Sequence, residues 1–129
     1  QAGDPQAAYQ NMHSALQIRD LAQARYNLAN VCHQLGRVDE ELEHLQRAVH
    51  LQPTFAAAHL NLGTLRMMRG EWAAAEGSLK QAVDLEPTLA TAHAHLGILY
   101  QLTGRPELSR AALNLARRLR VDAGQTPPQ

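Results

Sequence analysis

The stretch LQPTFAAAHLNLG, residues 51–63, returns as LEPTLATAHAHLG, residues 85–97, after a shift of 34 positions. Both stretches begin with Leu-x-Pro-Thr and end with Leu-Gly. The same spacing continues in both directions and defines three copies, at 22–55, 56–89 and 90–123. Internal periods of roughly 20–50 residues are typical of arrays built from one small supersecondary unit. The sequence therefore predicts a repeat protein.

Each copy carries two apolar helical patterns with a glycine between them. Leucines recur at the spacings of an amphipathic helix. Gly36, Gly70 and Gly104 follow the first pattern of their copies, where a left-handed helix C-cap is expected. Pro106 suits the first position of the second helix in copy three. Thr88 is placed to cap the N-terminus of the first helix in that copy.

Small residues mark where helices are expected to touch. Gly63 and Gly97 occupy equivalent positions, where they would let the two helices of one copy approach closely. The segment before the first copy has the small–large alternation of a second helix, at Ala8, Met12, Ala15 and Ile18. A lone helical hairpin cannot bury its apolar face. We therefore expect residues 5–19 to form an unpaired helix that covers the first copy.

This pattern resembles the tetratricopeptide repeat (TPR), a 34-residue helix–turn–helix unit. Copy three carries the family's motif as His93-x2-Leu96-Gly97-x2-Tyr100. Histidine replaces the usual tryptophan there, and Val121 replaces the closing proline. The resemblance implies an all-α, right-handed superhelical solenoid of three full repeats plus an N-terminal half-repeat helix, about seven helices in all. It would form a single domain over 1–129, with 124–129 as a flexible tail.

Composition narrows the function. Hydrophobic residues make up 45% of the 129 residues, and the 12 basic and 12 acidic residues cancel. A protein that neutralises several phosphates usually carries a basic excess, so no nucleic-acid partner is expected. A single cysteine forms no internal disulfide, and no apolar run approaches the ~20 residues of a membrane span. Arginine, alanine and leucine abound beside one lysine, which favours a bacterial source. The compartment stays open between cytoplasm and periplasm.

The resemblance implies that the first helices line a concave groove. With histidine neutral, none of the eighteen residues at the family's groove positions is formally charged. The candidate peptide-binding residues are Tyr26, Asn27, Asn30, His33, Leu60, Asn61, Thr64, Met67, His95 and Ile98. In some family members asparagines at the position of Asn27 and Asn61 hold a peptide backbone, which a carboxamide can do as donor and acceptor. Simple solvation of these asparagines is the alternative.

No metal, cofactor or catalytic group is expected. His93 and His95 are two residues apart on a helix, so they point in different directions and cannot share an ion. His44 lies among acidic residues and is expected to be solvated. Cys32 is expected to fill the core. The pattern holds no nucleophile–base arrangement and no phosphate loop.

Three functional hypotheses follow. The leading one is a non-catalytic scaffold that binds an extended, mostly uncharged or apolar segment of a protein partner in the groove. The second is homo-oligomer formation through the exposed C-terminal helix, whose segment 106–120 is rich in arginine. The third is that the chain is the targeting arm of a larger multidomain enzyme.

Overall fold

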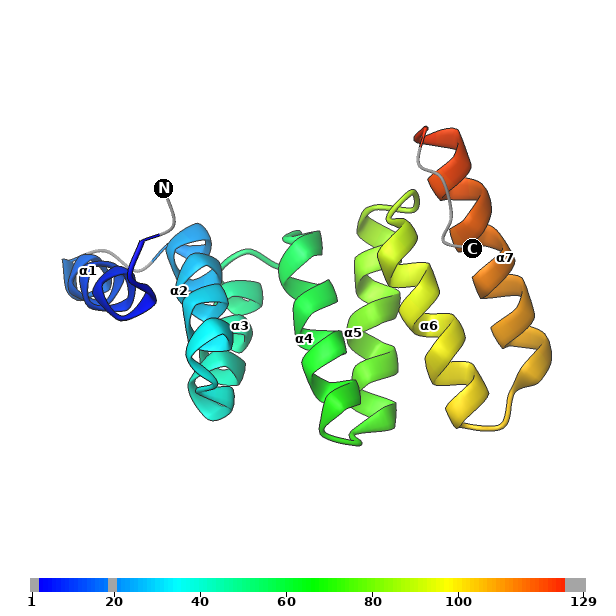
Figure 1. Ribbon diagram of the computed structural model, residues 1–129, viewed down its shortest axis with the longest axis horizontal. Helices are drawn as coiled ribbons and strands as arrows, with labels where there is room; N and C mark the ends of the chain where they lie inside the picture. The colour runs from blue at the N-terminus through cyan, green and yellow to red at the C-terminus, as the bar shows by residue number, and fades with distance from the viewer. Residues whose placement is uncertain (1–2, 19–20, 125–129) are drawn as a thin grey trace. The chain divides into compact units, whose positions relative to one another are not determined.

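In the computed structural model, residues 3–18 and 21–124 are described, with the backbone alone for 13–18. These residues form seven helices and no strand (Figure 1): α1 (Pro5–Ile18), α2 (Ala22–Leu35), α3 (Val38–Leu51), α4 (Ala56–Met68), α5 (Trp72–Leu85), α6 (Ala90–Leu102) and α7 (Pro106–Asp122). The all-α prediction is confirmed. Within the described part, no helix is long and apolar enough to cross a membrane.

Some sequence expectations concern parts that are not described. The last residue of the predicted 5–19 helix, the side chains of Ala15 and Ile18, and most of the predicted tail lie outside the described residues. The right-handed superhelical course and the extent of a single domain over 1–129 stay predictions.

Glycines end the first helix of each repeat. Gly36, Gly70 and Gly104 have φ angles of 73°, 76° and 75°. Only glycine adopts this left-handed conformation without a steric penalty, so the predicted caps are confirmed. Pro106 begins α7, also as predicted. Thr88 does not cap α6: the flanking residue is Leu89, and no side chain bonds to the helix end.

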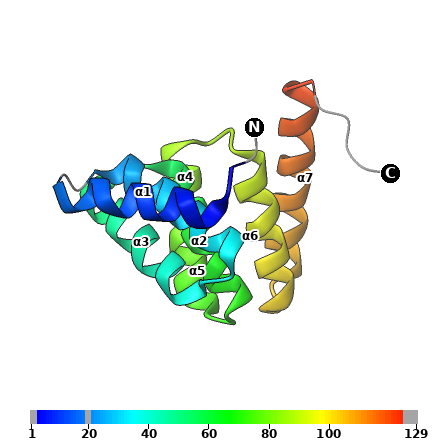
Figure 2. The same ribbon diagram turned by 60° about the vertical axis from the view of Figure 1, so that its left-hand side comes forward.

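The chain divides into two compact units, and the first comprises residues 1–58. Here α2 packs against α3 in an antiparallel hairpin, and α1 packs across α2 (Figure 2). The buried side chains Tyr9, Leu28, Val31 and Cys32 form its core. Ala8 and Met12 of α1 pack against this cluster. The N-terminal helix therefore buries apolar surface that the hairpin alone would expose to water.

The second unit comprises residues 59–129. Its core cluster consists of Ala75, Leu79, Leu96, Leu99 and Tyr100, with Leu60, Met67, Val83 and Ala112 packed against it. A Cβ atom on Gly63 would lie 2.7 Å from Cγ of Leu79, and one on Gly97 would lie 2.5 Å from Cγ of Leu113. Real Cβ atoms do not come so close. The predicted close approach of paired helices is therefore confirmed for α4 with α5 and for α6 with α7.

Candidate functional site

A hydrogen bond joins α4 to α6 on one face of the second unit. The Thr64 hydroxyl donates to the Leu60 carbonyl over 3.0 Å. Its oxygen also lies 2.9 Å from Nδ1 of His95. Because the hydroxyl has a single proton, His95 must donate through Nδ1–H in this arrangement. Burial lowers the pKa of His95. The pair is therefore a neutral link between the two helices.

Exposed apolar side chains flank this link. Met68 is 71% exposed, Leu102 58% and Ile98 46%. Helical spacing puts Ile98 and Leu102 on the same side of α6 as His95, and Met68 on the same side of α4 as Thr64. We name this surface the α4/α6 face; it comprises Leu60, Asn61, Thr64, Met67, Met68, His95, Ile98 and Leu102. It carries no formal charge while His95 is neutral, and methionine adapts to irregular apolar partners.

The residues predicted for this face differ in their surroundings. Leu60 and Met67 are half-buried and pack against the core cluster, so they support the fold as well as the surface. Asn61 is half-buried and already makes an interaction within the chain. The sequence prediction placed Met67 rather than Met68 in the site. Adjacent residues point about 100° apart on a helix, and only the packing distinguishes the buried methionine from the exposed one.

The predicted residues of the first unit all lie on α2. The Tyr26 ring packs on that of Phe55, with 4.9 Å between centroids. Asn27 accepts a hydrogen bond from Gln23 Nε2 over 2.9 Å. Asn30 is exposed and also interacts within the chain. The His33 side chain is 63% exposed, with Nδ1 3.3 Å from Oε1 of Glu41. Both asparagines therefore already take part in contacts within the chain.

A buried polar network lies among α1, α2 and α3. The expectation that His44 is solvated is wrong: it is 4% exposed, with Nδ1 2.9 Å from Nη1 of Arg25. One ligand atom each of Cys32, Glu40 and His44 lie within 4.8 Å of one another. The Tyr9 hydroxyl donates to Glu40, and burial raises the pKa of the Cys32 thiol to about 11. The positive charge of Arg25 beside His44 would repel a metal cation, so the cluster is a poor metal site. The Tyr9–Glu40 and Arg25–His44 contacts instead join α1 and α2 to α3.

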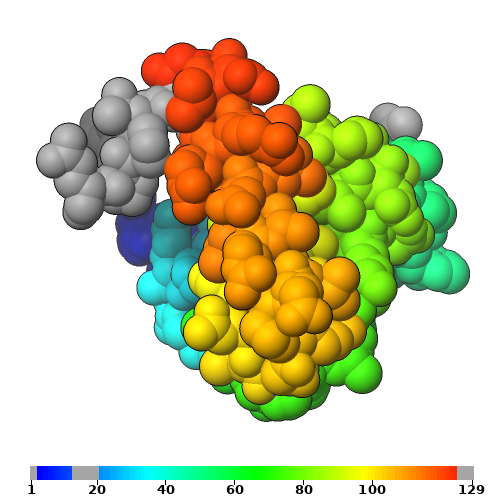
Figure 3. Space-filling model, turned by 90° about the vertical axis from the view of Figure 1, so that its right-hand side faces the viewer, coloured from blue at the N-terminus to red at the C-terminus, as the bar shows by residue number. Residues whose placement is uncertain are grey.

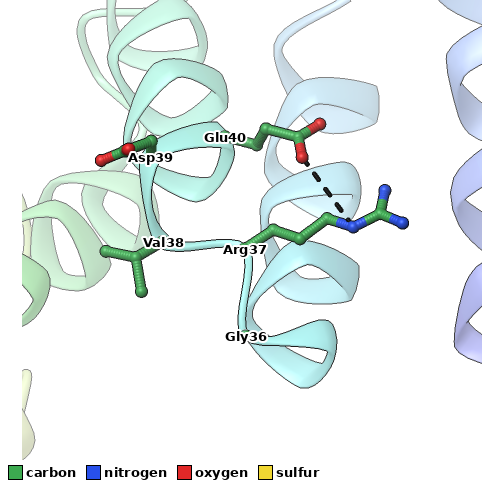
Figure 4. Close-up of a pocket in the computed structure, with 5 residues that line it drawn as sticks. All are labelled: Gly36, Arg37, Val38, Asp39 and Glu40. Carbon is green, nitrogen blue, oxygen red and sulfur yellow. Dashed lines mark ion pairs between the residues drawn. The ribbon is translucent and has the colours of Figure 1, made fainter.

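A hollow of about 380 Å³ lies at the turn between α2 and α3, lined by residues 36–40 (Figure 4). Arg37 and Glu40 extend to one side of it, with Nε and Oε1 3.8 Å apart. Arg37 also donates to Gln6 over 2.8 Å and lies over the Tyr9 ring, 4.9 Å from its centroid. These contacts already bind α1 to the hairpin. The charged side chains of Arg37 and Glu40 that line the hollow are therefore already used to hold α1 against the α2–α3 hairpin, which makes the hollow a poor ligand site.

Comparison with known proteins supports the repeat pattern. A sequence profile described as tetratricopeptide repeat matches residues 1–55, 43–90 and 60–123. The fold is similar to a crystal structure of MamA, at 20% identity over 93% of this chain and 71% of that one, with a TM-score of 0.86. It is also similar to YrrB, "a TPR protein with an unusual peptide-binding site", at 23% identity over 92% and 61%, with a TM-score of 0.80. Such identities show the fold alone. No curated protein sequence matches significantly.

Proposed function

The chain belongs to the tetratricopeptide repeat family, and we propose that it binds an extended, largely uncharged or apolar segment of another protein. Proteins of this family are generally non-catalytic interaction modules, and the fold is that of an interaction scaffold. The observation that carries the finer proposal is the α4/α6 face. It exposes Met68, Ile98 and Leu102 beside a neutral Thr64–His95 pair.

Apolar burial supplies the main driving force in this proposal. Covering ~300 Å² of apolar surface contributes on the order of 7 kcal/mol before the cost of ordering the segment. Asn61 and His95 would fix the position of the bound backbone by hydrogen bonds, since a carboxamide donates and accepts. On α2, the candidate contacts at equivalent repeat positions are Tyr26, Asn27, Asn30 and His33. The absence of fixed cations in this set disfavours a partner that presents a carboxylate.

A peptide display selection on the immobilised chain tests the proposal. We expect the enriched peptides to be poor in Asp, Glu, Lys and Arg. We expect Ile98→Glu to weaken their binding about tenfold or more, because it buries a charge without a partner. Leu108→Glu is the matched control, since Leu108 is 50% exposed but lies on α7, outside the α4/α6 face. Enrichment of charged peptides, or equal losses in the two variants, would overturn the proposal.

A second variant guards against effects on folding. Met67 packs against the core cluster, so a charge there would disturb the fold and leave a loss of binding ambiguous. Met68 is exposed, and Met68→Glu therefore alters the same face of α4 with little structural cost. We expect it to weaken the selected peptides in the same direction as Ile98→Glu, while circular dichroism shows unchanged helix content.

A further inference from the structure

A second hollow lies on the free side of the α6–α7 hairpin. It has a volume of about 500 Å³ and is lined by Gln101, Gly104, Pro106, Ser109, Arg110 and Leu113. Figure 3 looks onto this end of the second unit, with α7 in orange facing the viewer. The Ser109 hydroxyl within it donates to the Gly97 carbonyl over 2.7 Å. The wall of the hollow is thus preformed by bonds within the hairpin.

The 34-residue spacing shows what such a hollow holds elsewhere in the unit. Leu113 and Ser109 correspond to Leu79 and Ala75 of α5. Both α5 residues are fully buried, because α6 packs on them with Leu96, Leu99 and Tyr100. Leu113 is only half-buried, since among the described residues no helix packs on α7 as α6 packs on α5. The hollow is therefore the equivalent of a surface that binds a helix in the preceding repeat.

A polar contact accompanies that helix packing. Arg105, which follows the glycine cap of α6, reaches back to α5, where Nη2 lies 2.6 Å from Oε1 of Glu76. Arg37 makes a similar contact in the first unit, where it donates to Gln6 of α1, two positions before the equivalent of Glu76. Twice, then, the residue after a glycine cap bonds to an acceptor on the preceding second helix.

On α7 arginines stand where α5 has one acidic and one uncharged residue. Arg110 stands where α5 has Glu76, and Arg117 stands where α5 has Val83, which packs against the core cluster. A basic residue after the glycine cap of an arriving helix would meet repulsion here, and an acidic one would form an ion pair. We propose that this hollow binds an amphipathic helix of a partner protein, with its apolar ridge on Leu113 and its carboxylates paired with Arg110 and Arg117.

This inference goes beyond the proposed function, because it uses different residues and a different class of ligand. The probe is a labelled peptide that copies residues 89–105, the segment that fills the equivalent surface of α5. One form ends in Glu in place of Arg105, and the other keeps the arginine. Both are titrated against the wild-type chain, the Arg110→Glu variant and the Arg118→Glu variant by fluorescence anisotropy. Arg118 is exposed on α7 but corresponds to the exposed Asp84, so it is the matched control.

We expect the acidic peptide to bind the wild-type chain about fivefold more tightly than the basic one, since an attraction replaces a repulsion. Arg110→Glu should reverse that order, and Arg118→Glu should leave it unchanged. Because a free peptide must form its helix on binding, the same two sequences are also attached directly after Asp122, where the repeat spacing places the next helix. There, the acidic form should raise the thermal midpoint of the wild-type chain more than the basic form does.

Two results would overturn the proposal. One is equal behaviour of the acidic and basic forms, both as free peptides and when attached. The other is dimer formation by the wild-type chain alone in sedimentation, lost in Arg110→Glu, which would make a second copy of this chain the occupant. Failure of the display selection with Ile98→Glu would leave this test unaffected, since the two surfaces share no altered residue.

Discussion

At the scale of single residues, the close approach of α6 and α7 depends on the absence of one side chain. A Cβ on Gly97 would lie 2.5 Å and 2.6 Å from two carbons of Leu113, and 3.3 Å from its backbone nitrogen. The backbone atom cannot yield as a flexible side chain can. We expect Gly97→Ala to lower the free energy of unfolding by about 1–3 kcal/mol, as overpacking does in other cores. Urea denaturation measures this change.

Gly77 provides the control, because it lies inside α5 with no atom within 4 Å of an added Cβ. Gly77→Ala should raise the free energy of unfolding by about 0.5–1 kcal/mol, since alanine favours the helix over glycine. The same propensity gain is present in Gly97→Ala and must be outweighed there. If both variants stabilised the chain, the close approach of α6 and α7 would not constrain it.

At the scale of elements, one carboxylate connects α5 to the turn before α7. Glu76 Oε2 lies 2.8 Å from Nζ of Lys80 and 3.2 Å from Nη1 of Arg105. The Arg105 guanidinium also lies over the ring of Tyr100, 4.7 Å from its centroid, in a cation–π contact. Hydrogen bonds from Arg105 and Lys80 lower the pKa of Glu76 from 4.5 to about 2. The ionised carboxylate therefore stabilises the packing of α5 with the α6–α7 hairpin.

This shift predicts a loss of stability in acid. A carboxyl whose pKa is lower in the folded state stabilises that state above its unfolded pKa, and the contribution is lost as pH falls toward the folded value. Glu76 should therefore stop contributing between about pH 5 and pH 2. We expect Glu76→Gln to cost about 1 kcal/mol at neutral pH and to flatten the dependence of the thermal midpoint on pH.

The exposed Glu86 gives the matched variant, because Glu86→Gln removes the same charge from the end of the same helix. It should leave the acid dependence close to that of the wild type. A Glu76→Gln variant that lost stability in acid as steeply as the wild type would show that other carboxylates govern the transition.

At the scale of the whole molecule, the features that the sequence predicted are those with local causes. A glycine that follows a helical pattern favours a left-handed C-cap whatever the rest of the fold. Gly36 and Gly104, with φ angles of 73° and 75°, therefore allowed their turns to be predicted from the sequence. The 34-residue period then related each turn to the next. The prediction that Thr88 caps α6 was wrong because Thr88 lies one position too early in the sequence. The Leu89 amide donates to the Glu86 carbonyl over 3.1 Å, which extends the turn by one residue.

The candidate site was predictable only in part, because burial depends on partners distant in the sequence. His44 is buried beside Arg25, 19 positions earlier, and no local pattern reports that contact. Met67 and Met68 are adjacent residues of the same type, so the sequence does not show which one is buried. Only the packing of the core cluster, to which α6 contributes, distinguishes the half-buried Met67 from the exposed Met68. The reversal from Glu76 to Arg110 is visible in the sequence. The contact between Arg105 and Glu76, which gives that reversal its consequence, joins residues 29 positions apart and has no local sequence signal.

The balance of 12 basic against 12 acidic residues leads to a prediction for the chain in solution. Near the isoelectric point of about 7.2, molecules repel one another least, so exposed apolar side chains such as Leu102 can meet. Below the isoelectric point the chain carries a net positive charge, which increases the repulsion between molecules. The second virial coefficient from light scattering should therefore be lowest near neutral pH and rise toward pH 5.5. Arg110→Glu makes the chain more acidic and should move the minimum to lower pH. If that variant instead abolished association at every pH, the cause would be a specific contact at the α7 hollow rather than weak charge repulsion.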